Sequence, residues 1–153
     1  MAELTIFEGK VPAEQMRQEV VKLTEALLEM PQADIVTLHK FLPGIYERTI
    51  IVPPFTVLTG AAHKTAYRVR LESGVIAVNT DDGIKVLIGP CEFDVPAGFQ
   101  RAGRVYEEKV VWTDVYENLD NCRNIDELEA RLYEVPEYGL GDGRKGEFKW
   151  LDG

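Results

Sequence analysis

The feature that most constrains this chain is a long series of short β-prone segments between residues 34 and 116. Gly, Pro and Asp interrupt the series at close, even intervals, and these residues favour turns. Nothing of helical length separates the segments, which disfavours a parallel sheet with crossover helices. Many short, evenly spaced strands are typical of a sandwich or a small barrel. We predict strands at 35–39, 48–52, 55–59, 65–71, 75–79, 84–88, 91–95, 99–105 and 109–116.

Two amphipathic helices are predicted to flank the strands. The first covers residues 12–30 and carries an apolar stripe at helical spacing, formed by Met16, Val20, Leu23 and Leu27. The second covers residues 124–133, where Asn124 and Glu127 have the spacing of a capping box. We therefore divide the chain into an N-terminal arm with a packing helix, a barrel, and a C-terminal helix with an acidic, Gly-rich tail, at 1–33, 34–118 and 119–153.

Composition limits the classes of function. The chain has 153 residues, which is typical of one domain. Its formal charge of −9 argues against a general nucleic-acid binder, since such proteins need a basic face. Two cysteines without a CxxC pair make no disulfide framework, so a reduced, cytoplasmic protein is expected. The N-terminus lacks the pattern of a signal peptide, and no segment is apolar enough to span a membrane.

Two stretches resemble the cupin superfamily of double-stranded β-helix, or jelly-roll, barrels. The first runs from Thr59-Gly60-Ala61-Ala62-His63 to the turn at Gly74, and the second from Gly89-Pro90 through Pro96-Ala97-Gly98 to Arg101. The wider pattern also resembles uncharacterised cupin-like proteins of tailed bacteriophages. That pattern comprises His39-x-Phe41-x-x-Gly44-x-Tyr46-x-Arg48, Thr59-Gly60-x-x-His63-Lys64, Pro96-x-Gly98-x-x-Arg101 and Val111-Trp112-Thr113. The resemblance implies a mainly β, cupin-type jelly-roll barrel.

Cupins hold a divalent metal with four side chains inside the barrel. Alignment on Gly74 and on Pro96-x-Gly98 places those four positions on Ala61, His63, Tyr67 and Arg101. A transition-metal site needs about three nitrogen, oxygen or sulfur ligands, and a permanent cation repels a metal. We therefore expect no metal and no cofactor.

Strand periodicity indicates which of these groups share a face. Ala61, His63, Thr65, Tyr67, Val69 and Leu71 have one parity, and the resemblance directs that face into the barrel. A buried Arg101 guanidinium needs a counter-charge. One candidate is an internal carboxylate, namely Asp94, Glu107 or Glu72; the other is an anionic ligand, for which Arg offers a planar set of donors.

Trp112 lies on the last predicted strand at the parity of Val110 and Tyr116. It is either a core residue or an aromatic wall of the binding site. The candidate ligand-binding residues are therefore His63, Tyr67, Arg101 and Trp112.

Three hypotheses for function follow. The first is a non-catalytic, metal-free barrel that binds a small anion such as a nucleotide or sugar phosphate, and a phage could use it to sequester a host signalling nucleotide. The second is a structural or assembly protein of a phage particle without a ligand. The third is a metal-independent epimerase or isomerase in which His63 removes a proton and Tyr67 returns it. All three are expected to self-associate, in the host cytoplasm or, for the second, in the virion.

Overall fold

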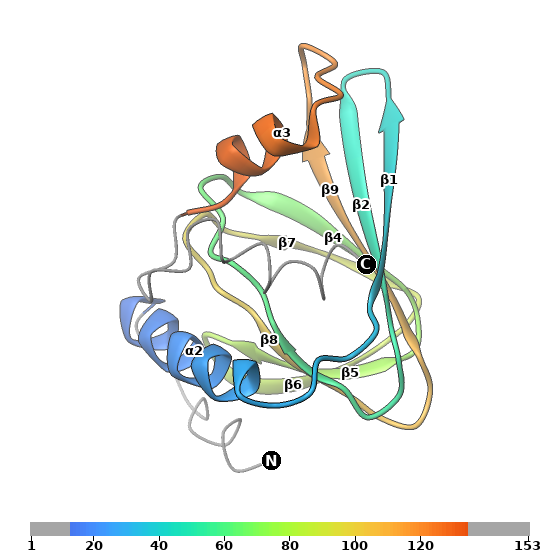
Figure 1. Ribbon diagram of the computed structural model, residues 1–153. Helices are drawn as coiled ribbons and strands as arrows, with labels where there is room; N and C mark the ends of the chain where they lie inside the picture. The colour runs from blue at the N-terminus through green and yellow to red at the C-terminus, as the bar shows by residue number, and fades with distance from the viewer. Residues whose placement is uncertain (1–12, 135–153) are drawn as a thin grey trace.

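The computed structural model describes residues 13–134 and shows two antiparallel sheets that face each other, with two helices beside them (Figure 1). The elements in chain order are α2 (Ala13–Leu28), β1 (Val36–Leu42), β2 (Ile45–Val52), β3 (Val57–Thr59), β4 (Tyr67–Ser73), β5 (Val75–Thr80), β6 (Gly83–Ile88), β7 (Cys91–Val95), β8 (Ala102–Val105), β9 (Val110–Glu117) and α3 (Ile125–Leu132).

The strands alternate between the two sheets along much of the chain. The five-stranded sheet has the order β1-β2-β9-β4-β7, and the four-stranded sheet has the order β3-β8-β5-β6. Non-consecutive strands are therefore neighbours in both sheets, as expected for a jelly roll. The predicted fold class, mainly β with an N-terminal and a C-terminal helix, is confirmed.

The predicted strands occur near their expected places, with two corrections. The segments at 35–39 and 48–52 extend toward each other into one hairpin, whose turn contains Gly44 at φ +71°. The strand expected at 99–105 begins at Ala102, because residues 99–101 leave the ladder and the Gln100 side chain donates to the carbonyl of Gly60.

The turn between β4 and β5 requires a glycine. Gly74 has φ +98°, and a Cβ atom there would lie 2.6 Å from the backbone oxygen of Lys109. Both the left-handed backbone and the close approach exclude a side chain. The geometry of this turn therefore explains the glycine at position 74, on which the family resemblance was aligned.

Strand periodicity, together with the cupin resemblance, correctly predicted which side of β4 is buried. Tyr67, Val69 and Leu71 are buried, while Arg68 on the opposite face is exposed. Thr65 is a correction: it was expected to face inward and is exposed, because the chain is irregular before Tyr67 and strand alternation does not apply there. The inward residues of both sheets form one hydrophobic core with residues of the helices.

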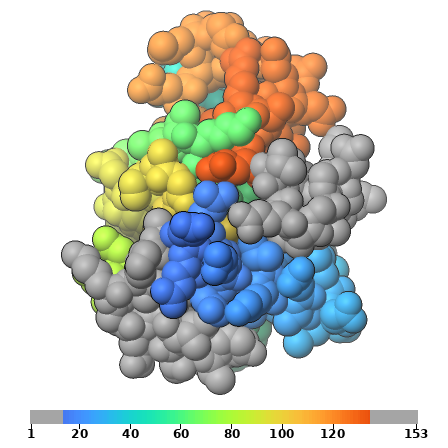
Figure 2. All heavy atoms as spheres, turned by 90° about the vertical axis from the view of Figure 1, so that its left-hand side faces the viewer, coloured from blue at the N-terminus to red at the C-terminus, as the bar shows by residue number. Residues whose placement is uncertain are grey.

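Both helices lie on the same face of the molecule, with α3 above α2 (Figure 2). Met16 and Val20 of α2 are fully buried, as the apolar stripe predicted, and Thr24 bonds Thr59 of β3 through their hydroxyls at 2.6 Å. At α3 the Asn124 side chain accepts from the backbone N–H of Glu127, which confirms the predicted N-cap.

The C-terminal Gly-rich segment, with its glycines at 139–146 and its apolar Phe148, Trp150 and Leu151, lies outside the described residues. Neither of the helices within residues 13–134 is long and apolar enough to cross a membrane.

Candidate functional site

A cavity of about 80 Å³ lies between the two sheets. The four residues that the sequence indicated all line this cavity, namely His63, Tyr67, Arg101 and Trp112. The fold therefore brings these residues from the β3–β4 connection, β4, the segment before β8, and β9 to one place.

Arg101 lies between aromatic rings and uses only part of its hydrogen-bonding capacity. Its guanidinium carbon is 4.5 Å from the ring centre of Phe99 and 5.5 Å from that of Phe93. Its Nη1 donates to the backbone oxygen of Asn79 at 2.6 Å. Its Nε is buried and has no hydrogen-bond partner among residues 13–134. A buried donor without a partner is rare in folded proteins and requires an explanation.

The three carboxylates proposed as partners of Arg101 lie elsewhere. Asp94 pairs with Arg68 at 2.8 Å, and Glu72 pairs with Arg70 at 3.3 Å, both on the outer face of the five-stranded sheet. Glu107 is exposed in the turn before β9. The prediction of Asp94, Glu107 or Glu72 was wrong. Glu72 and Asp94 lie at the outward-facing parity of β4 and β7, and Glu107 lies in a turn outside the strands.

The carboxylate that does face the cavity is Asp114 of β9. Trp112 Nε1 donates to its Oδ1 at 2.8 Å, and the Tyr116 hydroxyl donates to its Oδ2 at 3.1 Å. Burial raises the pKa of Asp114, whereas these two hydrogen bonds and the charges of Arg48 and Arg101 act in the opposite direction. Asp114 is thus held by neutral donors inside the barrel.

His63 stacks on Tyr67 with ring centres 4.0 Å apart, and its Nε2 is 2.8 Å from the Tyr116 hydroxyl oxygen. Burial, followed by the charge of Arg48, lowers the pKa of His63 to about 3. His63 is therefore uncharged at neutral pH.

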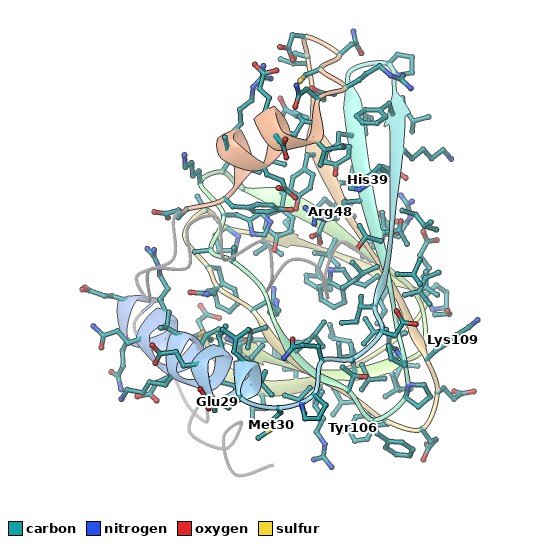
Figure 3. All side chains as sticks on the ribbon, in the orientation of Figure 1. Glu29, Met30, His39, Arg48, Tyr106 and Lys109 are labelled. Carbon is teal, nitrogen blue, oxygen red and sulfur yellow. The ribbon has the colours of Figure 1, made fainter. Side chains whose placement is uncertain are left out.

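A second arginine, Arg48 of β2, lines the cavity below α3 (Figure 3). Its Nη1 donates to the Tyr133 hydroxyl and lies 3.4 Å from a carboxylate oxygen of Glu129. Arg48 and Glu129 are both buried, at 4% and 6% exposure. This ion pair connects the five-stranded sheet to α3.

Sequence reasoning missed Arg48, Asp114 and Tyr133 as parts of the site. A signal existed for Asp114, since it lies between Trp112 and Tyr116 at the same strand parity. Arg48 likewise shares the parity of Tyr46 and Ile50 on β2. No sequence pattern pointed to Tyr133, because its position depends on how α3 packs on the barrel.

The residues at the cupin metal positions do not fit a metal. The side chains of Ala61 and Arg101 have no lone pair to offer a metal ion. The positive charges of Arg48 and Arg101 lie in the same cavity as His63 and Tyr67 and repel a metal cation. Among residues 13–134, no group of three His, Cys, Asp or Glu side chains could hold a metal ion.

A second, larger hollow shares Arg101 with the cavity. This outer groove has a volume of about 820 Å³ and lies along β5, β6 and β7. It is lined by Lys85, Phe93 and Phe99 as well as Arg101. A substitution of Arg101 consequently affects both hollows, whereas one of Lys85 affects the groove.

No family model and no curated protein matches this sequence. Solved structures similar to it include the cupin domain of an XRE-family transcriptional regulator from Enterobacter cloacae, with 15% identity, 56% of this chain and 97% of that chain covered, and a TM-score of 0.49. A cupin domain from Bordetella pertussis has 14% identity, 58% and 98% coverage, and a TM-score of 0.46. KdgF from Halomonas sp. has 11% identity, 65% and 93% coverage, and a TM-score of 0.49.

Two of the three proteins are described as cupin domains. The resemblance to phage proteins is tested by none of these comparisons and stays a prediction.

Proposed function

We propose that the barrel binds a small anionic molecule, without a metal and without catalysis. The observation that carries this proposal is Arg101, whose guanidinium lines the cavity with a buried Nε that has no partner among the described residues. An oxygen of an anionic ligand is the natural acceptor for such a donor, because charge-assisted hydrogen bonds are the stronger ones.

The Tyr67 hydroxyl supports the same ligand class. Tyr67 lines the cavity, and its side chain makes ring contacts with His63 and Tyr116. Burial raises the pKa of Tyr67 well above its ordinary value, so the hydroxyl keeps its proton. Arg101 and Tyr67 together offer donors, which suit an acceptor-rich ligand.

The size of the cavity favours the smallest of the expected anions. Its volume of about 80 Å³ is less than a nucleotide requires. We therefore propose a compact organic anion as the ligand. The volume of the cavity does not support the nucleotide or sugar phosphate that we predicted from the sequence.

Binding is favoured over catalysis by the state of His63. A general base works best when its pKa lies near the working pH. The pKa of His63 is about 3, so this imidazole is a weak base at neutral pH. It serves better as a neutral wall of the site than as the group that removes a proton.

Native mass spectrometry of the gently purified full chain tests the proposal. We expect a stoichiometric mass excess, and we expect Arg101→Gln to lose it. The same excess in Arg101→Gln would contradict the proposal, as would a bare polypeptide mass for the wild type or an excess that matches a transition metal. The spectrum also counts subunits and so tests the predicted self-association.

A further inference from the structure

Resting on the proposed function, we infer that the ligand is a monocarboxylic acid with a short apolar chain. Its carboxylate binds the Arg101 guanidinium, and its chain extends along the barrel toward Val52 and Val110. Three features support this ligand. One edge of the Arg101 guanidinium has no hydrogen-bond partner among the described residues, the cavity lining becomes less polar in one direction, and the cavity already contains charged side chains.

The Arg101 guanidinium has one occupied side and one open edge. Nη1 is occupied by the Asn79 carbonyl, while Nε has no partner and no hydrogen bond of Nη2 is found within residues 13–134. The Nε–H and one Nη2–H bond are parallel, and this edge binds two coplanar oxygens at once. A carboxylate has that shape.

The five-stranded sheet becomes less polar in one direction along the cavity. In the register of β2 and β9, Arg48 faces Asp114, then Ile50 faces Trp112, then Val52 faces Val110. Successive pairs are two residues apart along both strands, and all six residues line the cavity. A ligand that is polar at one end and apolar at the other matches this order.

The four-stranded sheet forms the opposite apolar wall. Leu58, Ile76 and Gly103 line the cavity from β3, β5 and β8. A Cβ atom on Gly103 would lie 2.9 Å from Ile76 Cδ1 and 3.4 Å from Leu58 Cδ2, so these two side chains already pack against the glycine. An alkyl chain between the sheets would therefore contact Leu58 and Ile76.

The fixed charges favour a ligand with one negative charge. Arg48 is already paired with Glu129, and Asp114 contributes a carboxylate to the same cavity as Arg101. A phosphate monoester would bring up to two further negative charges beside Asp114. A monocarboxylate brings one, and its repulsion from Asp114 is correspondingly smaller.

The test is a titration of the full chain with acetate, butyrate and hexanoate. In a Trp150→Phe background Trp112 is the single tryptophan, and its fluorescence reports on the cavity. We expect the affinity to rise about fourfold for each added methylene, which corresponds to about 0.8 kcal/mol per buried CH₂. Hexanamide, which has the chain without the charge, is expected to bind at least tenfold more weakly, as judged by the value of a charged hydrogen bond.

Variants locate the two ends of the ligand. Arg101→Gln should weaken hexanoate at least tenfold. The matched control Arg104→Gln should have no effect, since Arg104 packs on Tyr106 outside the cavity. Gly103→Ala should weaken hexanoate more than acetate, because the added methyl group displaces the Ile76 side chain, which lines the apolar part of the cavity.

The outcomes separate this inference from the proposed function. Arg101-dependent binding of inorganic phosphate and acetate, equal to that of hexanoate, would overturn the apolar acid and leave anion binding intact. Binding of hexanamide as tight as hexanoate, unaffected by Arg101→Gln, would overturn both. Loss of hexanoate binding in Lys85→Gln, with no effect of Gly103→Ala, would move the site to the outer groove and overturn the inference.

Discussion

The arginines on the outer face of the five-stranded sheet and those in the interior of the barrel differ in the groups they contact. On the outer face, Arg68 meets Glu92 and Asp94, and Arg70 meets Glu47 and Glu72. Inside the barrel, Arg101 meets two aromatic rings and one carbonyl, and its Nε has no partner within residues 13–134.

The difference shows which arginine has donors left for a ligand. The outer arginines pair with carboxylates of β2, β4 and β7, so they have their counter-charges within the chain. Arg101 lies where desolvation is severe, and burial lowers its pKa. An arginine in that position is costly unless something compensates it. The Asp114 carboxylate in the same cavity supplies part of the compensation, and we assign the rest to a ligand.

The largest expected effect is a difference in the free energy of unfolding between substitutions of the two inward-facing arginines. Arg48→Met should lower the free energy of unfolding by about 3–5 kcal/mol, because it leaves the buried Glu129 without its cation. Arg101→Met should change it by no more than about 1 kcal/mol, because Asp114 keeps its two hydrogen bonds. Urea denaturation of both variants without added ligand gives the two values.

Equal costs for the two substitutions would contradict this distinction. Arg101 would then stabilise the fold as Arg48 does, and its buried Nε would need no ligand to explain it.

A smaller effect is expected on the pH dependence of the free energy of unfolding, through His63 in the interior. The pKa of His63 is about 3 in the folded chain against an ordinary value of 6.5, so the unfolded chain binds more protons between these two values. The free energy of unfolding therefore falls as the pH drops below about 6.5, by an amount on the order of a few kcal/mol by pH 3. Asp114, whose pKa is raised, contributes with the opposite sign.

His63→Gln isolates the histidine's contribution. The stability difference between wild type and this variant should shrink or reverse as the pH falls from about 6.5 toward 3, because only the wild type loses the contribution of a neutral imidazole. His39→Gln is the matched control; the pKa of His39 is also lowered, but this residue is exposed and a smaller change is expected. A constant difference across the range for His63→Gln would show that this ring is not held neutral.

The smallest effect is expected on the outer face. Arg68→Gln should leave the urea midpoint unchanged within error, because Arg68 and its partners are exposed and solvent screens such pairs. Binding of hexanoate should also be unchanged in this variant. A clear drop in the midpoint would mean that the outer ion pairs hold β4 to β7, and the contrast with the interior would lose its basis.

Much of the fold was predictable from strand alternation, and four residues of the site were predictable from alternation together with the family resemblance. The parity of β4 and β9 directed Tyr67 and Trp112 inward, and the same rule, applied to β9 and β7, would have placed Asp114 inside and Asp94 outside. Residues that depend on packing between distant elements were not predictable. The contact of Arg48 with Glu129 and Tyr133 spans 81 and 85 positions and exists because α3 packs over β2.

The most direct test of the central claim is a crystal structure of the full chain with hexanoate. We predict two carboxylate oxygens within about 3 Å of Arg101 Nε and Nη2, with the alkyl chain between Trp112 and Gly103. A carboxylate bound beside Lys85 in the outer groove would contradict the account, and so would a barrel without hexanoate in which Arg101 Nε donates to a group of the protein itself.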